Sequence, residues 1–270
     1  MELTIELACI FFLLGIVAGF LAGLLGTGGA SFILPIFTIY FIRKGISQDT
    51  SFYLSLGTVM AITAFTMFSS MLAQRKRGGI VYSIAKVMIF GAVLGVFFST
   101  FLATKINPIY LSILLIAFMS YGSYSMFTKK RVELSKEALP KPVIFICSYA
   151  IGTVSGLISV GGGILMVPFL MWQNIDIKKA IGTSSAVGFF ITTVGTFGYI
   201  LNGLKDTNLE NIDYTFGYLY LPAVFIISIA SFLAAPFGVK LVYTLPVILI
   251  KRIFGFVSLG LALKMFFEIV

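Results

Sequence analysis

GLLGTGGASFILP, at Gly23 to Pro35, and GLISVGGGILMVP, at Gly156 to Pro168, are two versions of one pattern, and each lies inside long apolar sequence. Glycine runs in a membrane helix release backbone N–H and C=O groups that hydrocarbon cannot satisfy, so such breaks persist only where they line a cavity or are buried in protein. The repeated pattern therefore predicts a membrane protein made of two related halves, with one helix break in the interior of each.

The composition supports a membrane location. Of 270 residues, 59% are hydrophobic and 11% are charged, and the mean hydropathy is +1.06, which leaves too little polar surface to cover a soluble globule. The net charge of +9 would suggest a nucleic-acid partner in a soluble protein. Here Lys and Arg lie in short loops between apolar runs, where they act as topology signals. We therefore predict the lipid bilayer, and no nucleic acid, as the surroundings of the chain.

Ten apolar runs predict an all-α fold with five segments in each half. A helix needs about 20 residues to cross a hydrocarbon core of ~30 Å, so the second run of each half is too short to cross alone. We expect 8 to 10 membrane segments and leave open whether the glycine-linked segments cross or re-enter. The runs are 5–25, 30–42, 52–73, 80–104, 107–127, 143–160, 163–173, 180–201, 216–239 and 244–268.

The similarity of the halves defines the domain organisation. Gly57-Thr58 matches Gly182-Thr183, and Ala61 matches Ala186. The charged stretch KKRVELSKEALPKP separates the halves and is the only long polar segment. We predict a first transmembrane repeat at 1–128, a cytoplasmic linker at 129–142 and a second transmembrane repeat at 143–270.

Loop charge predicts the orientation of the chain. Arg75, Lys76, Arg77 and the linker mark cytoplasmic loops, because short cytoplasmic loops are enriched in Lys and Arg. The first half then runs from outside to inside and the second from inside to outside, so the halves are inverted repeats with both termini outside. Such repeats suit alternating access in secondary transporters. We expect a multi-pass protein of a prokaryotic cell membrane (inner or plasma membrane). The basic residues placed outside are Arg43, Lys44, Lys105, Lys205 and Lys264.

The residues that could carry chemistry are few. All ten acidic residues lie in predicted loops or near segment ends, and histidine is absent, so the sequence contains no buried acid–base pair and no metal-ligand cluster. GTGG at Gly26 is not a nucleotide fingerprint, because Ser31 replaces the third glycine. Cys9 and Cys147 form neither a disulfide framework nor a metal motif. We predict no enzyme activity, no catalytic residue, no metal and no cofactor.

What remains is a neutral polar group around the breaks. Short helices beginning near Ala30 and Gly163 would point free N–H groups into the membrane interior, a geometry that favours a small anion. Freed carbonyls could still hold Na⁺, so the sequence leaves a coupling ion (H⁺ or Na⁺) and a homo-oligomer open. Glycines spaced four apart, such as Gly15, Gly19 and Gly23, are expected to allow close helix packing instead. The predicted substrate-binding residues are Thr27, Gly28, Gly29, Ala30, Ser31, Thr58, Ser159, Gly161, Gly162, Gly163, Thr183, Ser184 and Ser185.

These same segments resemble the TauE/SafE family of sulfite and sulfonate exporters. GTGGASFILP and VGGGILMVP resemble its glycine-rich motif followed by proline, and AIGTSSAVGFF resembles its A-x-GTS segment. The likeness covers nearly the whole chain. It implies a small sulfur-containing anion, such as sulfite, sulfoacetate or another organosulfonate, as substrate. The first half departs from the pattern at Ala30, where the second has Gly163, and at Met60, where the second has Ser185.

Together these features predict a secondary transporter, or permease, that exports a small sulfur-containing anion by alternating access to a midplane site. A cytoplasm at about −100 mV favours the exit of each negative charge by ~2.3 kcal/mol, so export needs no coupling ion. A gated anion channel and a transporter of a different small organic anion are the alternatives. A membrane scaffold or sensor would need a partner surface, for which 129–142 is small.

Overall fold

The computed structural model describes residues 5–127, 139–209 and 212–269. Most of the predicted linker at 129–142 therefore lies outside the described residues. The same holds for the side chains of Ala30 and Ser31, although their backbone is described.

The described residues form ten α-helices, as the apolar runs predict. Six of them, α1, α3, α4, α6, α8 and α9, are long and apolar enough to cross a membrane, and α2 and α7 are short apolar helices. The prediction of a helical, multi-pass membrane protein is confirmed. The helices are α1 (Ile5–Leu25), α2 (Ala30–Arg43), α3 (Gln48–Lys76), α4 (Tyr82–Ala103), α5 (Pro108–Phe127), α6 (Lys141–Ile158), α7 (Gly163–Trp172), α8 (Ile177–Gly203), α9 (Leu221–Thr244) and α10 (Val247–Ile269).

The segment before α9 corrects the all-α prediction. The run predicted at 216–239 does not begin as a helix: β1 (Thr215–Phe216) pairs antiparallel with β2 (Leu219–Tyr220), and a short 3₁₀ helix, η1 (Thr207–Leu209), precedes this hairpin. Gly217 has φ 57° and so permits the tight turn between the strands. The Tyr218 hydroxyl donates to an Asp206 carboxylate oxygen at 2.6 Å. Burial raises the pKa of Tyr218, and this hydrogen bond raises it further, so the phenol stays protonated as the donor.

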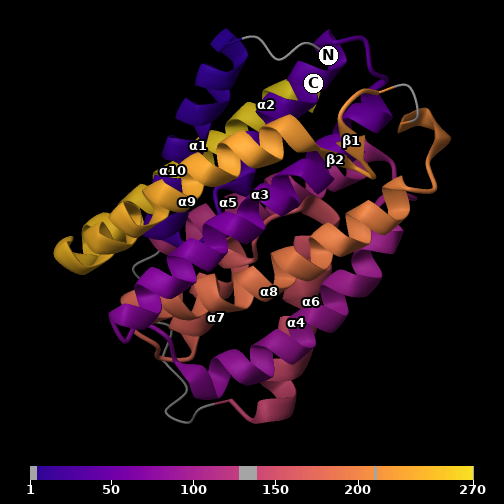
Figure 1. The fold of residues 1–270 in the computed structure, drawn as a ribbon. Coiled ribbons are helices and arrows are strands. Elements are labelled where there is room, and N and C mark those ends of the chain that lie inside the picture. Colours follow the sequence, from indigo (N-terminus) through magenta and orange to yellow (C-terminus); the bar gives the residue numbers. More distant parts are fainter. Residues whose placement is uncertain (1–4, 128–138, 210–211, 270) are drawn as a thin grey trace.

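The six long helices pack in the order α1, α9, α3, α8, α4, α6 (Figure 1). In the remaining part of the bundle, α2 packs on α3, α7 packs on α8, and α5 pairs with α10. The same neighbours result when each helix of α1 to α5 is exchanged with its counterpart five helices later, so that α1 takes the place of α6 and α6 that of α1. The central helices α3 and α8 are antiparallel, because Gly182 lies against Gln74 while Gly195 lies against Met60.

Glycine allows the outer helix pairs to pack closely. A methyl group at Gly19 of α1 would lie 2.5 Å from the Cα atom of Ser231 in α9, and one at Gly152 of α6 would lie 2.6 Å from the Cα atom of Ala92 in α4. Neither position has room for a larger residue. Gly15 and Gly23 face α9 in the same way, so the prediction that these glycines serve helix packing is confirmed.

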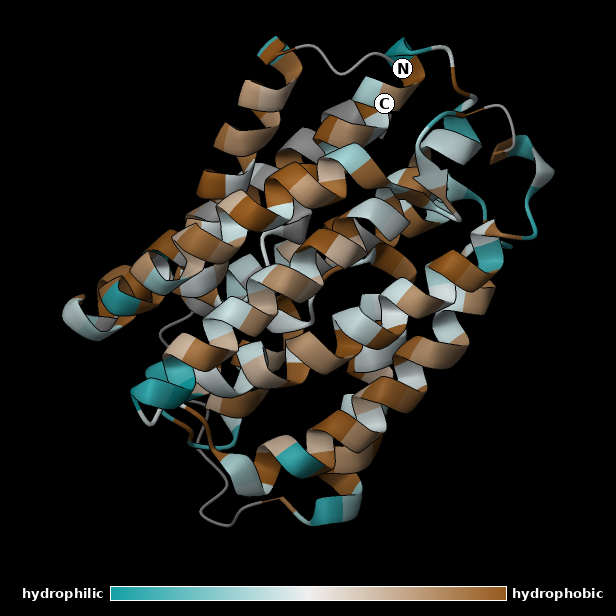
Figure 2. Ribbon diagram, in the orientation of Figure 1, coloured by the Kyte–Doolittle hydropathy of each residue, from teal (hydrophilic) through white to brown (hydrophobic). Residues whose placement is uncertain are grey.

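The surface agrees with a membrane location. Large apolar side chains such as Phe90, Phe225 and Phe237 are between 66% and 70% exposed, and Figure 2 shows hydrophobic residues along the helices with hydrophilic residues gathered near their ends. We call the end that carries Arg75 to Arg77 the basic end and the end that carries β1 and β2 the hairpin end.

Candidate functional site

The first break, residues 26–29, joins α1 to α2. Gly26, Gly28 and Gly29 have φ values of 69°, 82° and 73°, a left-handed conformation that glycine adopts at little cost. Gly29 is the N-cap of α2, and no side chain caps that helix. The first N–H groups of α2 thus have no intrahelical acceptor and receive none from the N-cap side chain.

The second break, residues 159–162, joins α6 to α7 in a similar way. Gly162 is the N-cap of α7 with φ 78°, and no side chain caps this helix either. At the position that corresponds to Gly26 stands Ser159, with φ 51°. A residue with a Cβ atom is uncommon in this conformation and carries a cost there.

Ser159 combines that backbone with an unsatisfied side chain. Its side chain is fully buried, and its Oγ atom has no hydrogen-bond partner among the described residues. The Tyr199 hydroxyl lies beside it and donates to the Gly156 carbonyl at 2.7 Å, so it offers Ser159 only the lone pairs of its oxygen. A strained residue with an unpaired buried hydroxyl is the kind of outlier that indicates function.

The two breaks meet each other. A methyl group at Gly163 would overlap the carbonyl oxygen of Gly26, and one at Gly161 would lie 3.2 Å from the Thr27 carbonyl oxygen. The Ser184 hydroxyl of α8 donates to the same Gly26 carbonyl at 2.9 Å. The departure noticed in the sequence, Gly163 in place of Ala30, therefore has a packing reason, since Gly163 faces the other break without space for a side chain.

Helix α3 crosses this meeting point at its middle. A methyl group at Gly161 would lie 3.1 Å from Thr63 Cγ2 and 2.8 Å from Met67 Cε, and both side chains also contact Gly28. Thr63 is fully buried and its Oγ1 atom has no partner among the described residues. The breaks thus lie about midway along the longest helix.

Thr63 differs from its neighbours in how its hydroxyl is used. Thr58, Thr66, Thr192 and Thr193 each donate to the carbonyl one turn back, at 2.7 to 2.9 Å, which is the ordinary arrangement for threonine in a membrane helix. Thr63 makes no such bond: its methyl group packs against Gly28 and Gly161, and its hydroxyl has no partner among the described residues.

Other predicted residues lie away from the breaks. The Thr58 hydroxyl accepts from the Tyr220 N–H, and the Thr183 hydroxyl accepts from the Val81 N–H, each at 3.0 Å. These two threonines therefore anchor the segments that precede α9 and α4. Ser185 donates to the Ile181 carbonyl and accepts from the Ser70 hydroxyl, both at 3.0 Å.

The structure brings the rest of the predicted site together. These residues form the two breaks or hydrogen-bond to them, namely Thr27, Gly28, Gly29, Ser159, Gly161, Gly162, Gly163 and Ser184. The predicted roles of Ala30 and Ser31 depend on side chains outside the described part. Sequence reasoning missed Thr63 and Met67. Thr63 matches Gly188 in the other half, and Gly188 also lies against Gly161, but this shared position is visible only in the structure.

The surroundings of the breaks are electrically neutral. No Asp, Glu, Lys or Arg side chain is buried among the residues that the structure describes, and those residues contain no cluster of potential metal ligands. Hydroxyls, backbone N–H groups and the N-termini of α2 and α7 are the available donors. Such a set suits an anion, since it provides donors without burying a counter-charge.

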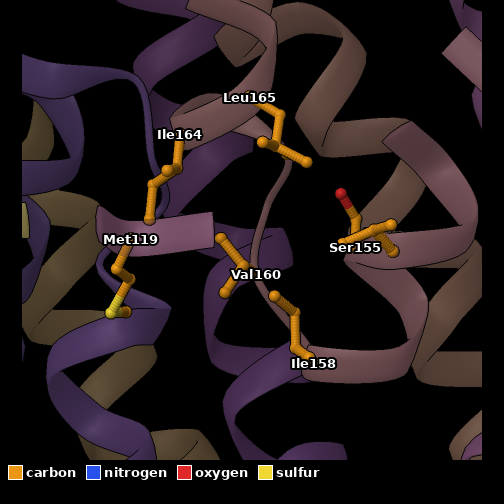
Figure 3. A pocket seen from close by; sticks show the side chains of 8 residues that line it. Met119, Ser155, Ile158, Val160, Ile164 and Leu165 are labelled. Atoms are coloured by element: carbon orange, nitrogen blue, oxygen red, sulfur yellow. The ribbon is translucent and has the colours of Figure 1, made fainter. Parts of the chain in front are cut away.

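A small cleft adjoins the second break. Met119 of α5 and Ser155 and Ile158 of α6 line it together with Val160 and Gly162 of the break and residues of α7 (Figure 3). Its walls are apolar, and it has room for about one water molecule. The Ser155 hydroxyl is buried and unpartnered among the described residues. An anion as large as sulfite would therefore need these walls to move apart.

Long apolar helices around two paired, uncharged helix breaks define a multi-pass membrane protein with an internal polar site. Within that class, a match to the family described as Sulfite exporter TauE/SafE covers residues 11–265. The chain belongs to this family, which consists of membrane transporters and not of enzymes.

Curated relatives agree in length and description. A "Probable membrane transporter protein" of Haemophilus influenzae is 30% identical over 268 residues, covering 98% of this chain and 99% of the relative. MJ0441 of Methanocaldococcus jannaschii, with the same description, is 25% identical over 231 residues, covering 85% of this chain and 84% of the relative. YdhB of Bacillus subtilis is 26% identical over 209 residues, covering 73% and 79%. No solved structure matches the chain.

Proposed function

We propose that this transporter exports small sulfur-containing anions, such as sulfite, sulfoacetate or other organosulfonates, through a site where its two helix breaks meet. The observation that carries the proposal is a pair of buried hydroxyls without a partner among the described residues: that of Ser159, in the second break, and that of Thr63, whose methyl group contacts both breaks. The N-caps of α2 and α7 at these breaks supply no side-chain cap. An oxyanion accepts hydrogen bonds and would satisfy these donors together.

The substrate-binding group consists of the two breaks, Ser159 included, and Thr63, while Ser184 holds the Gly26 carbonyl from α8. Backbone N–H groups of α2 and α7 face an anion at the positive ends of their helices. Family membership supports sulfur in the substrate, because the family description names sulfite. The absence of buried charge among the described residues supports an anion over a cation, since carboxylates are common ligands of cations.

Transport proceeds by alternating access between two inverted repeats, 1–128 and 143–270. Each helix of the first half has a counterpart in the second (α1 and α6, through to α5 and α10), and counterparts have equivalent neighbours, which supports the repeats. The counterparts α3 and α8 are antiparallel, which supports their inversion. Rocking of one repeat against the other opens the closed site to each side in turn. The basic end faces the cytoplasm, and both termini face outward, since Arg75 to Arg77 lie in a short loop.

The proposal can be tested by flux from proteoliposomes loaded with ³⁵S-sulfite or a labelled organosulfonate. We expect saturable efflux driven by an interior-negative potential, and Thr63→Val should lower it about tenfold or more, since a hydrogen bond to a charged group is lost while shape is kept. Thr66→Val is the matched control, because the Thr66 hydroxyl is already bonded to Ile62 and Ser231.

Two results would contradict the proposal. Efflux of chloride and cations without efflux of sulfur anions would show that sulfur-containing anions are not the substrates. Unitary conductance in planar bilayers would indicate the gated channel instead, because alternating access is far slower than diffusion through an open pore.

A further inference from the structure

One face of α3 leads from the breaks to the basic end. Thr63, Met67, Ser70 and Gln74 follow one another on it at spacings of three and four residues, and Arg77, the C-cap of α3, continues the spacing. Thr63 contacts both breaks, Ser70 pairs with Ser185 of α8, and Arg77 is exposed at the end of the stripe. The stripe therefore connects the site to the basic end.

Gln74 is the unusual member of this stripe. Its side chain is fully buried, and its Nε2 group has no hydrogen-bond partner among the described residues. Its Oε1 atom accepts from the Tyr243 hydroxyl of α9 at 2.7 Å. The amide is thus held at its oxygen, while a group with two N–H donors is left unsatisfied in a buried place.

Space around the amide oxygen is kept by glycine. A methyl group at Gly79 would lie 2.6 Å from Gln74 Oε1, and one at Gly182 would lie 3.1 Å from it. Gly79 begins the segment that the Thr183 hydroxyl anchors at Val81. The chain from α3 to α4 and the start of α8 therefore close around Gln74 and hold its oxygen towards Tyr243.

Two cationic side chains lie beside Tyr243, the residue that hydrogen-bonds to Gln74. The Arg77 guanidinium lies 5.2 Å from the centre of the Tyr243 ring, and the Lys178 ammonium lies 6.0 Å from it and donates to the Tyr243 carbonyl at 3.3 Å. Asp176 is the acidic residue nearby, and its carboxylate accepts the Lys178 N–H at 2.9 Å. Two positive charges against one negative charge attract anions to this part of the basic end.

We propose that Gln74 is an oxyanion-binding residue at the entrance from the basic end, and that Tyr243 covers it while that entrance is closed. The proposal rests on the proposed transport of small anions. When the Tyr243–Gln74 hydrogen bond opens, the amide N–H groups take the oxygens of a sulfite or sulfonate group that Arg77 and Lys178 have attracted. The anion then moves along the α3 stripe towards Ser70 and the breaks.

The test compares variants of the full chain in proteoliposomes, with ³⁵S-sulfite flux measured against sulfite concentration. Gln74→Leu keeps the volume and removes both donors, so it should raise the half-saturating concentration about tenfold or more. Gln74→Glu keeps the length but repels an anion, so it should raise this value at least as much. Tyr243→Phe keeps the ring between the cations, removes the covering hydrogen bond and should lower the value.

Asn202→Leu is the matched control for losing an amide. Asn202 lies at the hairpin end, and its Nδ2 group already donates to the carbonyls of Thr100 and Gly198. Its replacement should lower the melting temperature in detergent without changing the half-saturating concentration. If Gln74→Leu and Gln74→Glu behave like Asn202→Leu, Gln74 does not bind the anion, although the transport proposal stands.

Melting temperatures with added sulfite and sulfate separate the two proposals. If the wild-type chain carries no sulfur anion but sulfate raises its melting temperature, and this shift is absent in Gln74→Leu and kept in Asn202→Leu, Gln74 binds oxyanions and the transport proposal is wrong. Absence of both flux and any shift in the wild-type chain overturns both proposals.

Discussion

At Ser159 the chain keeps a side chain where the equivalent position of the other break is Gly26. Ser159 has φ 51° and a buried, unpartnered hydroxyl, so both backbone and side chain are unfavourable without a ligand. Ser159→Gly should therefore stabilise the protein in detergent by about 1 kcal/mol, since relief of the left-handed strain exceeds the entropy lost to glycine. The same change should reduce anion flux, because a donor is removed.

Ser155→Gly is the control for this residue. Ser155 is also buried and unpartnered, but it lies inside α6, where glycine lowers helix stability by about 0.5 to 1 kcal/mol. Thermal melting in the same detergent should move in opposite directions for the two variants. A lower melting temperature for Ser159→Gly would show that its hydroxyl stabilises the fold and is not kept for a ligand.

Sequence patterns were enough to name the residues of the breaks but were less informative beyond them. Glycine runs inside apolar sequence identify a break, so its members, Ser159 included, could be named. Thr63 could not, because threonines in membrane helices ordinarily bond to their own backbone and the sequence does not tell which one fails to do so. Thr58 and Thr183 were named as substrate residues, but the structure gives their hydroxyls to backbone N–H groups.

At the scale of the elements, the position of α7 against the first break depends on its first residue, Gly163. Gly163 faces the Gly26 carbonyl without space for a methyl group, so Gly163→Ala should push the two breaks apart. We expect a loss of about 1 to 3 kcal/mol, as for other overpacked interiors, together with loss of flux. Gly260→Ala in α10 is the control, since Gly260 has nothing within 4 Å of a methyl group. Equal melting temperatures and flux for the two variants would contradict the close contact of the breaks.

The elements themselves were predictable to different degrees. Length and hydropathy were enough for the helices, because a membrane leaves few other solutions for the backbone. The hairpin at Thr215 to Tyr220 was missed, since apolar and aromatic residues there continue into the run of α9 and read equally well as the start of a helix. Only the left-handed Gly217 marks the turn, and its φ value is a property of the structure.

For the whole molecule, the sequence predicted duplication but not the partners of each helix. Glycines at four-residue spacing indicated close packing, yet the pairing of α1 with α9 and of α4 with α6 joins segments from opposite halves. Such pairing depends on the surfaces of both helices and cannot be read from either alone. It matters for the proposed mechanism, because each half then holds the outer helix of the other, and the proposed rocking would shift these contacts together.

The proposed orientation of the whole molecule can be measured with single cysteines. Gly45 lies between α2 and α3 at the hairpin end, and Gly78 lies between α3 and α4 at the basic end; both are open loop positions with nothing within 4 Å of a methyl group. In a background with Cys9→Ser and Cys147→Ser, a membrane-impermeant maleimide should label Gly45→Cys in intact cells. It should label Gly78→Cys only after permeabilisation, because short basic loops remain in the cytoplasm. The reverse pattern would place the basic end outside, and Gln74 would then face the exit and not the entrance of an exporter.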